Sequence, residues 1–259
     1  MPNSELHGQW ICLAKEKGVP ELALLASKLS RRARGQLLAS IKQHVDHPDI
    51  RTQESTRIAL VKLLIAMVPN SWTTIRTLII DRGRTSVDAE VQFSLFCYLG
   101  DLQHLTAGRG LISEAACLVG DYLRQSKSNT GHATWMAGDL LGENWDSGEG
   151  VPILIDVLTN GTYAEGRLAA LHGLEHAIGN ADCSDALAES LVRAIIHVAS
   201  NDRSRSVRES AQHVCGGVSA CSHPEMARRM KGKHRETGDS HLLWRVYNPE
   251  RQTRRGSHG

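Results

Sequence analysis

The sequence is poor in aromatic residues. Phe, Tyr and Trp make up 4% of its 259 residues, and two of these are Phe. The hydrophobic share is nevertheless 41%, so Ala, Leu and Ile carry most of the apolar content. This composition favours a folded chain of close-packed helices, because helices need good helix formers and small residues where they touch. It excludes disorder as a description of the whole protein.

Several targeting and cross-linking signals are missing as well. The longest apolar run, residues 63–68, falls far short of the roughly 20 residues that a membrane-spanning helix needs. The N-terminal residues lack the basic and apolar regions of a secretory signal. The six Cys include no CxxC pair and several lie in apolar helical windows, so we interpret them as buried thiols of a reducing compartment. We therefore expect a cytoplasmic protein that does not contact membranes.

Charge is distributed unevenly along the chain. Residues 1–220 contain 21 Lys and Arg against 24 Asp and Glu, whereas residues 221–259 contain nine against four. A basic tail attracts anionic partners, so nucleic acid bound through this tail is one alternative for the function. The acidic balance of the larger part does not favour a DNA-gripping surface there.

A helical segment recurs five times in the middle of the chain. Its copies align without gaps on residues 57, 92, 134, 167 and 208, with spacings of 35, 42, 33 and 41 residues, the period of helix-pair repeats. Three and seven residues after each alignment position, the side chains are apolar or small and share one helix face, which we predict to be buried. The first of these two sites holds Leu60, Leu95, Ala137, Ala170 and Ala211, and the second holds Leu64, Leu99, Leu141, Leu174 and Cys215.

Another amphipathic stretch and a polar link precede each copy, so each repeat is predicted to be a helical hairpin. The preceding stretches are residues 35–45, 71–81, 112–125, 150–158 and 184–200. One hairpin cannot bury its apolar stripe alone, and stacked hairpins build a continuous core. We predict N-terminal capping helices at 1–34, a repeat solenoid at 35–220 and a basic, partly disordered C-terminal extension at 221–259.

The segment Val207-Arg208-Glu209-Ser210-Ala211, which follows a polar link, resembles the HEAT repeat. Other copies depart from the family pattern, with Gln92 and Thr134 where the family prefers Arg, and Glu175 where it prefers Gly. The resemblance covers about residues 35 to 220. It implies an all-α protein, an α-solenoid of about five HEAT-like helical hairpins with an N-terminal helical cap, that binds a protein partner through its concave face.

One motif matches an enzyme signature. The run His172-Gly173-Leu174-Glu175-His176 satisfies the H-x-x-E-H pattern of the inverted zinc metallopeptidases, and histidines four residues apart share a helix face. Those peptidases are much larger α/β proteins with a distant third ligand, whereas this motif lies within a helical repeat. We do not predict a peptidase, and the sequence leaves open whether this histidine pair binds a metal.

Two HEAT-like enzyme families also resemble this architecture. The deoxyhypusine hydroxylases bind a di-iron centre through His-Glu dyads one and two residues after the alignment position, and no such dyad occurs there in this sequence. The alkylpurine DNA glycosylases grip duplex DNA through a basic inner surface, which the acidic balance disfavours. We therefore assign no catalytic residue, metal or cofactor. A nucleic-acid-binding or glycosylase-like HEAT protein, and a metal-dependent enzyme using concave-face His, Asp and Glu, are the alternatives.

Polar side chains recur on the second helix of the repeats. In the HEAT family these helices line the concave side, and helices packed about 8 to 10 Å apart can bring such side chains into one stripe. Two aromatic residues beside the stripe suggest anchors for a partner, although they can instead pack against the next repeat. A solvated helix face and a metal site are the alternatives for the stripe. The predicted partner surface consists of Phe93, Asp101, Trp135, Asp139, Glu143, His172, Glu175, His176 and His213.

Overall fold

The computed structural model describes residues 2–45, 53–80, 86–127, 131–145, 147–178 and 184–218. Every regular element within these ranges is a helix, which confirms the all-α prediction for this part of the chain. Within the same ranges, no helix is both long and apolar enough to span a membrane. The basic extension predicted at 221–259 lies outside the described residues.

Three helices open the chain, namely α1 (Pro2–Glu16), α2 (Val19–Ser27) and α3 (Arg31–Val45). Pro20 lies in the first turn of α2, where its missing N–H forfeits no helical hydrogen bond. All three helices pack against α5 (Glu54–Ala66), which explains why α5 is buried along most of its length. Because α3 begins at Arg31, the boundary predicted between residues 34 and 35 falls inside this helix.

From α3 onward, consecutive helices form pairs whose members pack against each other. The pairs are α3 with α5, α6 (Trp72–Ile80) with α7 (Ser86–Leu99), α8 (Ile112–Arg124) with α9 (Gly131–Asp139), α10 (Ser147–Asn160) with α11 (Ala164–Ile178), and α12 (Asp185–Asn201) with α13 (Arg205–Val218). The 3-10 turns η1 (Gly100–His104) and η2 (Arg109–Leu111) lie between α7 and α8, and a π-helical turn, η3 (Leu140–Asn144), continues α9.

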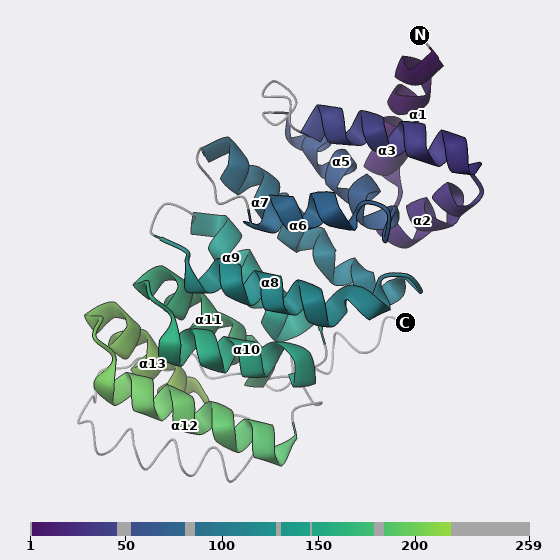
Figure 1. Ribbon diagram of the computed structural model, residues 1–259. Helices are drawn as coiled ribbons and strands as arrows, with labels where there is room; N and C mark the ends of the chain where they lie inside the picture. The colour runs from purple at the N-terminus through teal and green to yellow at the C-terminus, as the bar shows by residue number, and fades with distance from the viewer. Residues whose placement is uncertain are drawn as a thin grey trace.

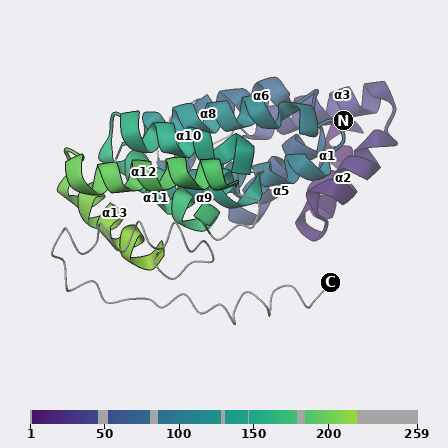
Figure 2. The ribbon, with the colours of Figure 1, turned by 90° about the horizontal axis from the view of Figure 1, so that it is seen from below.

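The pairs stack into two layers. The first helices α6, α8, α10 and α12 each contact the next, and so do the second helices α5, α7, α9, α11 and α13 (Figure 1). Figure 2 shows the two rows from below, running along the same direction from α5 and α6 to α12 and α13. We call the side chains that the second helices and η3 turn toward solvent the second-helix face.

The core lies between these layers and continues from one pair to the next. All ten residues of the two predicted apolar sites are buried, from Leu60 and Leu64 to Ala211 and Cys215. This outcome follows from the 3.6-residue period, which places both sites of each copy on the side that faces neighbouring helices.

Four of the five alignment positions, Arg57, Gln92, Thr134 and Arg167, are buried polar residues, and the two arginines link neighbouring pairs. Arg167 is 3% exposed at its side chain and donates from Nε to Asp202 Oδ2 at 2.8 Å and from Nη1 to the Gly161 carbonyl oxygen at 2.8 Å. Arg57 reaches from α5 to α7, where it donates to Ser94 Oγ at 3.1 Å and to a carboxylate oxygen of Glu90 at 3.0 Å. Each guanidinium therefore joins parts of the chain that come from successive repeats.

The prediction of buried thiols is wrong for three cysteines. Cys12, Cys97 and Cys117 are exposed free thiols, and Cys215 is buried. The three exposed cysteines do lie in helices with apolar neighbours along the chain, but each of them is on the solvent side of its helix. Burial raises the pKa of Cys215 to about 12, which keeps this thiol protonated.

Candidate functional site

Glycines let α9 and η3 approach α11 until their backbones touch. A Cβ atom on Gly142 would lie 2.1 Å from the carbonyl oxygen of Gly173, and a Cβ atom on Gly173 would lie 2.3 Å from that of Gly138. Side chains at these positions would hold the two segments apart. Each glycine directly adjoins a polar residue of the predicted surface in the sequence. The close contact therefore brings the polar side chains of α9 and η3 within reach of those of α11.

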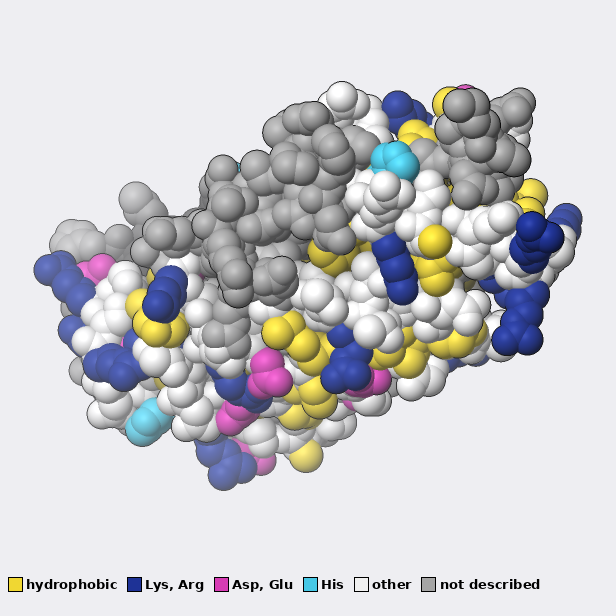
Figure 3. Space-filling view, turned by 45° about the horizontal axis from the view of Figure 1, so that its top comes forward, with side chains coloured by type: hydrophobic (Ala, Val, Ile, Leu, Met, Phe, Trp, Pro, Cys, Tyr) yellow, Lys and Arg dark blue, Asp and Glu magenta, His cyan; other side chains and the backbone are white. Residues whose placement is uncertain are grey.

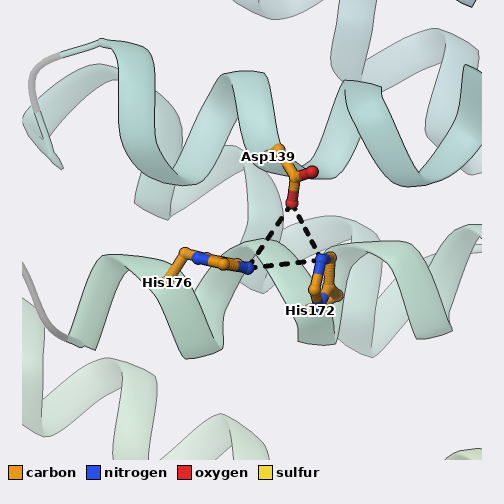
Figure 4. A group of neighbouring side chains, drawn as sticks. All are labelled: Asp139, His172 and His176. Atoms are coloured by element: carbon orange, nitrogen blue, oxygen red, sulfur yellow. Dashed lines mark hydrogen bonds and ion pairs between the residues drawn. The ribbon is translucent and has the colours of Figure 1, made fainter.

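Three ligand-type side chains converge across this contact (Figure 4). Asp139 is the last residue of α9, and His172 and His176 lie one turn apart on α11. The Asp139 Oδ1 atom lies 2.9 Å from His172 Nε2 and 3.7 Å from His176 Nε2, and the two Nε2 atoms are 3.3 Å apart. We call these three residues the Asp-His-His cluster.

The cluster is half-buried. The side chains of Asp139, His172 and His176 are 22%, 31% and 37% exposed, respectively. Contact with the Asp139 carboxylate raises the pKa of His172 above its ordinary value, and the negative charges of Glu175 and Glu143 add to this effect, whereas burial acts in the opposite direction.

Glu143 lies on the outer side of the cluster and contacts His176 Nδ1 with its Oε1 atom. It belongs to η3, the π-helical turn that begins directly after Asp139. Single π turns are frequent at functional sites because they change which side chains share a face. Here the turn carries a second carboxylate to the far nitrogen of the same imidazole ring.

Two aromatic side chains border the cluster. Trp135 is 38% exposed and forms a T-shaped contact with His172, with ring centroids 4.7 Å apart. Phe93 is partly buried against the core and lies edge-on to His132, with centroids 6.3 Å apart. Trp135 therefore remains available at the surface, whereas Phe93 is in part a packing residue.

The remaining predicted surface residues lie outside the cluster. Asp101 is partly buried in η1, where burial raises the pKa of its carboxyl while His104 and Lys62 act to lower it. Glu175 is exposed on α11 and His213 is exposed on α13. Sequence reasoning thus placed the members of the cluster on one face but also included residues that the structure does not bring to it.

Sequence reasoning missed two features. His132, whose ring lies edge-on to that of Phe93, was not singled out, although it lies on the same helix as Trp135. The glycine contact was missed as well, and its signal was the spacing of Gly138 and Gly142 beside Asp139 and Glu143.

Comparison of the chain with protein-family models, with curated proteins and with solved structures finds no match.

Proposed function

We propose that this protein is a HEAT-like α-solenoid without catalytic activity that binds a basic segment of a partner protein. The second-helix face, which would line the concave side, is the proposed contact surface. Trp135 is the observation that carries the proposal. Among the described residues, the exposed large hydrophobic side chains are Leu24, Ile80, Trp135 and Tyr163, and of these Trp135 is the one that belongs to a second helix.

Exposure of the large apolar surface of an indole to water is unfavourable, and Trp is a frequent anchor residue of protein interfaces. Its position beside carboxylates and imidazoles gives the surrounding surface the polar rim that interfaces commonly have. Edge contact with His172 also restricts the Trp135 ring, so less conformational freedom is lost when a partner packs on it.

The charge of the surrounding helices selects the chemistry of the partner. Among the described side chains of the helices α7, α9 and α11 and the turn η3, five are acidic, namely Glu90, Asp139, Glu143, Glu165 and Glu175. The same elements contain one basic residue, Arg167, whose guanidinium is buried against Asp202. A Lys- or Arg-bearing segment complements this surface, because opposite charges steer association and exclude partners of the wrong sign.

Nucleic acid is the weaker candidate for the described part of the chain. DNA binding requires Lys and Arg gathered along one surface to neutralise the phosphates. The second helices from α7 to α11 offer acidic groups instead. On the face in Figure 3 acidic side chains lie among the basic ones in the lower middle, and Lys and Arg gather mainly at the right end. The basic tail, which lies outside the described residues, is the remaining basis for the nucleic-acid alternative.

The test is binding of the full chain to an array of basic, neutral and acidic peptides and to duplex DNA. We expect retention of basic peptides, weakened when salt is raised from about 0.05 M to 0.5 M because exposed charges are then screened. Trp135→Ala should reduce affinity by about 30-fold, the equivalent of about 2 kcal/mol for an anchor residue.

Tyr163→Ala is the matched control, because this aromatic residue is 36% exposed but lies in the link before α11. Both variants must keep the wild-type melting temperature for the comparison to count. Equal affinities of the two variants, or a preference of the wild-type chain for DNA over basic peptides, would refute the proposed function.

A further inference from the structure

We propose that Asp139, His172 and His176 bind a single divalent transition-metal ion such as Zn²⁺, and that Glu143 orients the ligand His176 through contact with its Nδ1 atom. The proposal goes beyond partner binding and does not depend on it. Its basis is the position of three ligand atoms, the chemistry of the donor set and the way the helices are held together.

The separations of the ligand atoms fit one shared ion. For Zn–N and Zn–O bonds of about 2.0 to 2.2 Å, two ligand atoms of a tetrahedral set lie about 3.3 to 3.6 Å apart. In the Asp-His-His cluster the two Nε2 atoms are 3.3 Å apart, which lies in this range, while Asp139 Oδ1 is 3.7 Å from His176 Nε2, just above it, and 2.9 Å from His172 Nε2, below it. Figure 4 shows these atoms turned toward a common point between α9 and α11.

Hydrogen bonding among the described residues does not account for this convergence. Asp139 Oδ1 is shielded from solvent, and among the described residues its nearest basic group, His172 Nε2 at 2.9 Å, approaches it without full hydrogen-bond geometry. The two Nε2 atoms face each other, an arrangement in which a proton on both would be repulsive. A cation between the three atoms satisfies the buried oxygen and both lone pairs together.

The donor set selects the class of ion. Imidazole nitrogens suit Zn²⁺ and other first-row transition metals, whereas Mg²⁺ and Ca²⁺ take oxygen ligands. His172 and His176 are four residues apart on one helix face, so both can reach the same ion, and Asp139 supplies the third ligand from the neighbouring helix. Three protein ligands leave a coordination position for water or another donor.

Glu143 and the glycine contact prepare the cluster for the ion. A carboxylate at Nδ1 of His176 stabilises a proton on that nitrogen and leaves the Nε2 lone pair free for a metal. The backbone contact at Gly138, Gly142 and Gly173 fixes the distance between the two ligand-bearing segments. The ligands are therefore carried by packed helices rather than by loops, which favours a preorganised site.

The test is calorimetric titration of the chelator-stripped full-length protein with ZnCl₂, with MgCl₂ as the hard-ion control. We expect one Zn²⁺ equivalent in the wild type that is absent from His172→Ala/His176→Ala, and no corresponding signal with Mg²⁺. The tail outside the described residues contains further His and a Cys, so an equivalent that persists in the double variant is not assigned to this site. Co²⁺ bound to the wild type should show the visible absorption of tetrahedral coordination, and the double variant should not.

Three further variants keep the test decisive. Asp139→Asn has nearly the same size as the original residue and should lose the same equivalent with little change of fold. Glu143→Gln should weaken Zn²⁺ binding about 10-fold or more, as expected for removal of a supporting carboxylate. His197→Ala, an exposed histidine on α12, should bind like the wild type. Wild-type stoichiometry and affinity in both His172→Ala/His176→Ala and Asp139→Asn would overturn the proposal, even if Trp135→Ala abolishes partner binding.

Discussion

Replacing Gly173 by alanine should destabilise the protein even though alanine is the better helix former. In the interior of a helix this exchange normally contributes up to about 1 kcal/mol of stability. At Gly173, however, the added Cβ atom would lie 2.3 Å from the Gly138 carbonyl oxygen and 3.0 Å from Leu154 Cδ1, where ordinary contacts begin at 3.4 Å. The obstacle is backbone, which cannot rotate away, so α9 and α11 must move apart.

The two effects can be weighed against each other. Overpacking of a core typically costs about 1 to 3 kcal/mol, and an overlap with backbone belongs at the upper end of that range. After the gain in helix propensity is subtracted, we expect Gly173→Ala to lower the free energy of unfolding by about 2 kcal/mol. The shift of α11 should also weaken Zn²⁺ binding, because the short Asp139 side chain cannot follow the histidines.

Gly35→Ala supplies the control of opposite sign. Gly35 lies in α3, and a Cβ atom there would meet nothing within 4 Å. This variant should gain about 0.5 to 1 kcal/mol. Urea denaturation followed by helical circular dichroism measures both changes, provided that the slope of the transition is unchanged. A midpoint for Gly173→Ala at or above that of Gly35→Ala would refute the idea that glycine contact sets the spacing of these helices.

Three other predictions concern the core. Ala170→Asp buries an unpaired charge at a position that is 0% exposed, so the free energy of unfolding should fall by about 3 kcal/mol or more. An unchanged unfolding midpoint in urea would contradict the assignment of the buried face. Asp202→Asn leaves the Arg167 guanidinium buried without its carboxylate and should cost about 3 kcal/mol at neutral pH. Burial favours the protonated form of Asp202, but the hydrogen bonds from Arg167 and the Ser204 N–H hold the pKa of this carboxyl below 3.8. The stability that Asp202 contributes is therefore present above its unfolded-state pKa and is lost as pH falls through its folded-state pKa. A stability difference between the wild type and Asp202→Asn that stays constant from neutral to strongly acidic pH would exclude this linkage. Burial lowers the pKa of Lys62 below 10.5, against the opposing effect of the Asp101 charge. As pH approaches 10.5, the unfolded chain therefore binds more protons than the folded protein, and the stability of the wild type should rise with pH relative to that of Lys62→Met. Parallel pH profiles of stability for the two proteins would contradict this prediction.

Periodicity along the chain was sufficient to predict the helix pairs from α3 to α13 and the side that each second helix buries. The polar links predicted where the first helix of a pair gives way to the second, as in the link that separates α12 from α13. These features are local, because a 3.6-residue repeat of apolar residues determines a helix face whatever packs against it. The same reasoning was wrong for Cys12, Cys97 and Cys117, since an apolar window does not say which of its residues faces the solvent.

The candidate site was predictable in part. Equivalent positions in successive repeats line up along a stack, so Asp139, Glu143, His172, His176 and His213 were expected in one stripe. The structure brings the first four into contact, whereas His213 is exposed on α13 outside the cluster. The repeat copy aligned on Thr134 was predicted as an uninterrupted helix, whereas α9 ends at Asp139 and continues as a π-helical turn. That turn is not encoded by apolar periodicity, because it depends on what lies opposite in the neighbouring helix.

The sequence by itself determined the succession of helix pairs, the buried face of each second helix and the shortage of cations on α7, α9 and α11, because each depends on residue type and on spacing along one helix. The tertiary structure decided the distance between α9 and α11. That distance depends on Gly138 and Gly142 meeting Gly173 across two helices, a contact that no periodicity within one helix contains. It places Asp139 Oδ1 at 2.9 Å from His172 Nε2, and it turns a row of polar residues into a cluster whose ligand atoms can share one ion.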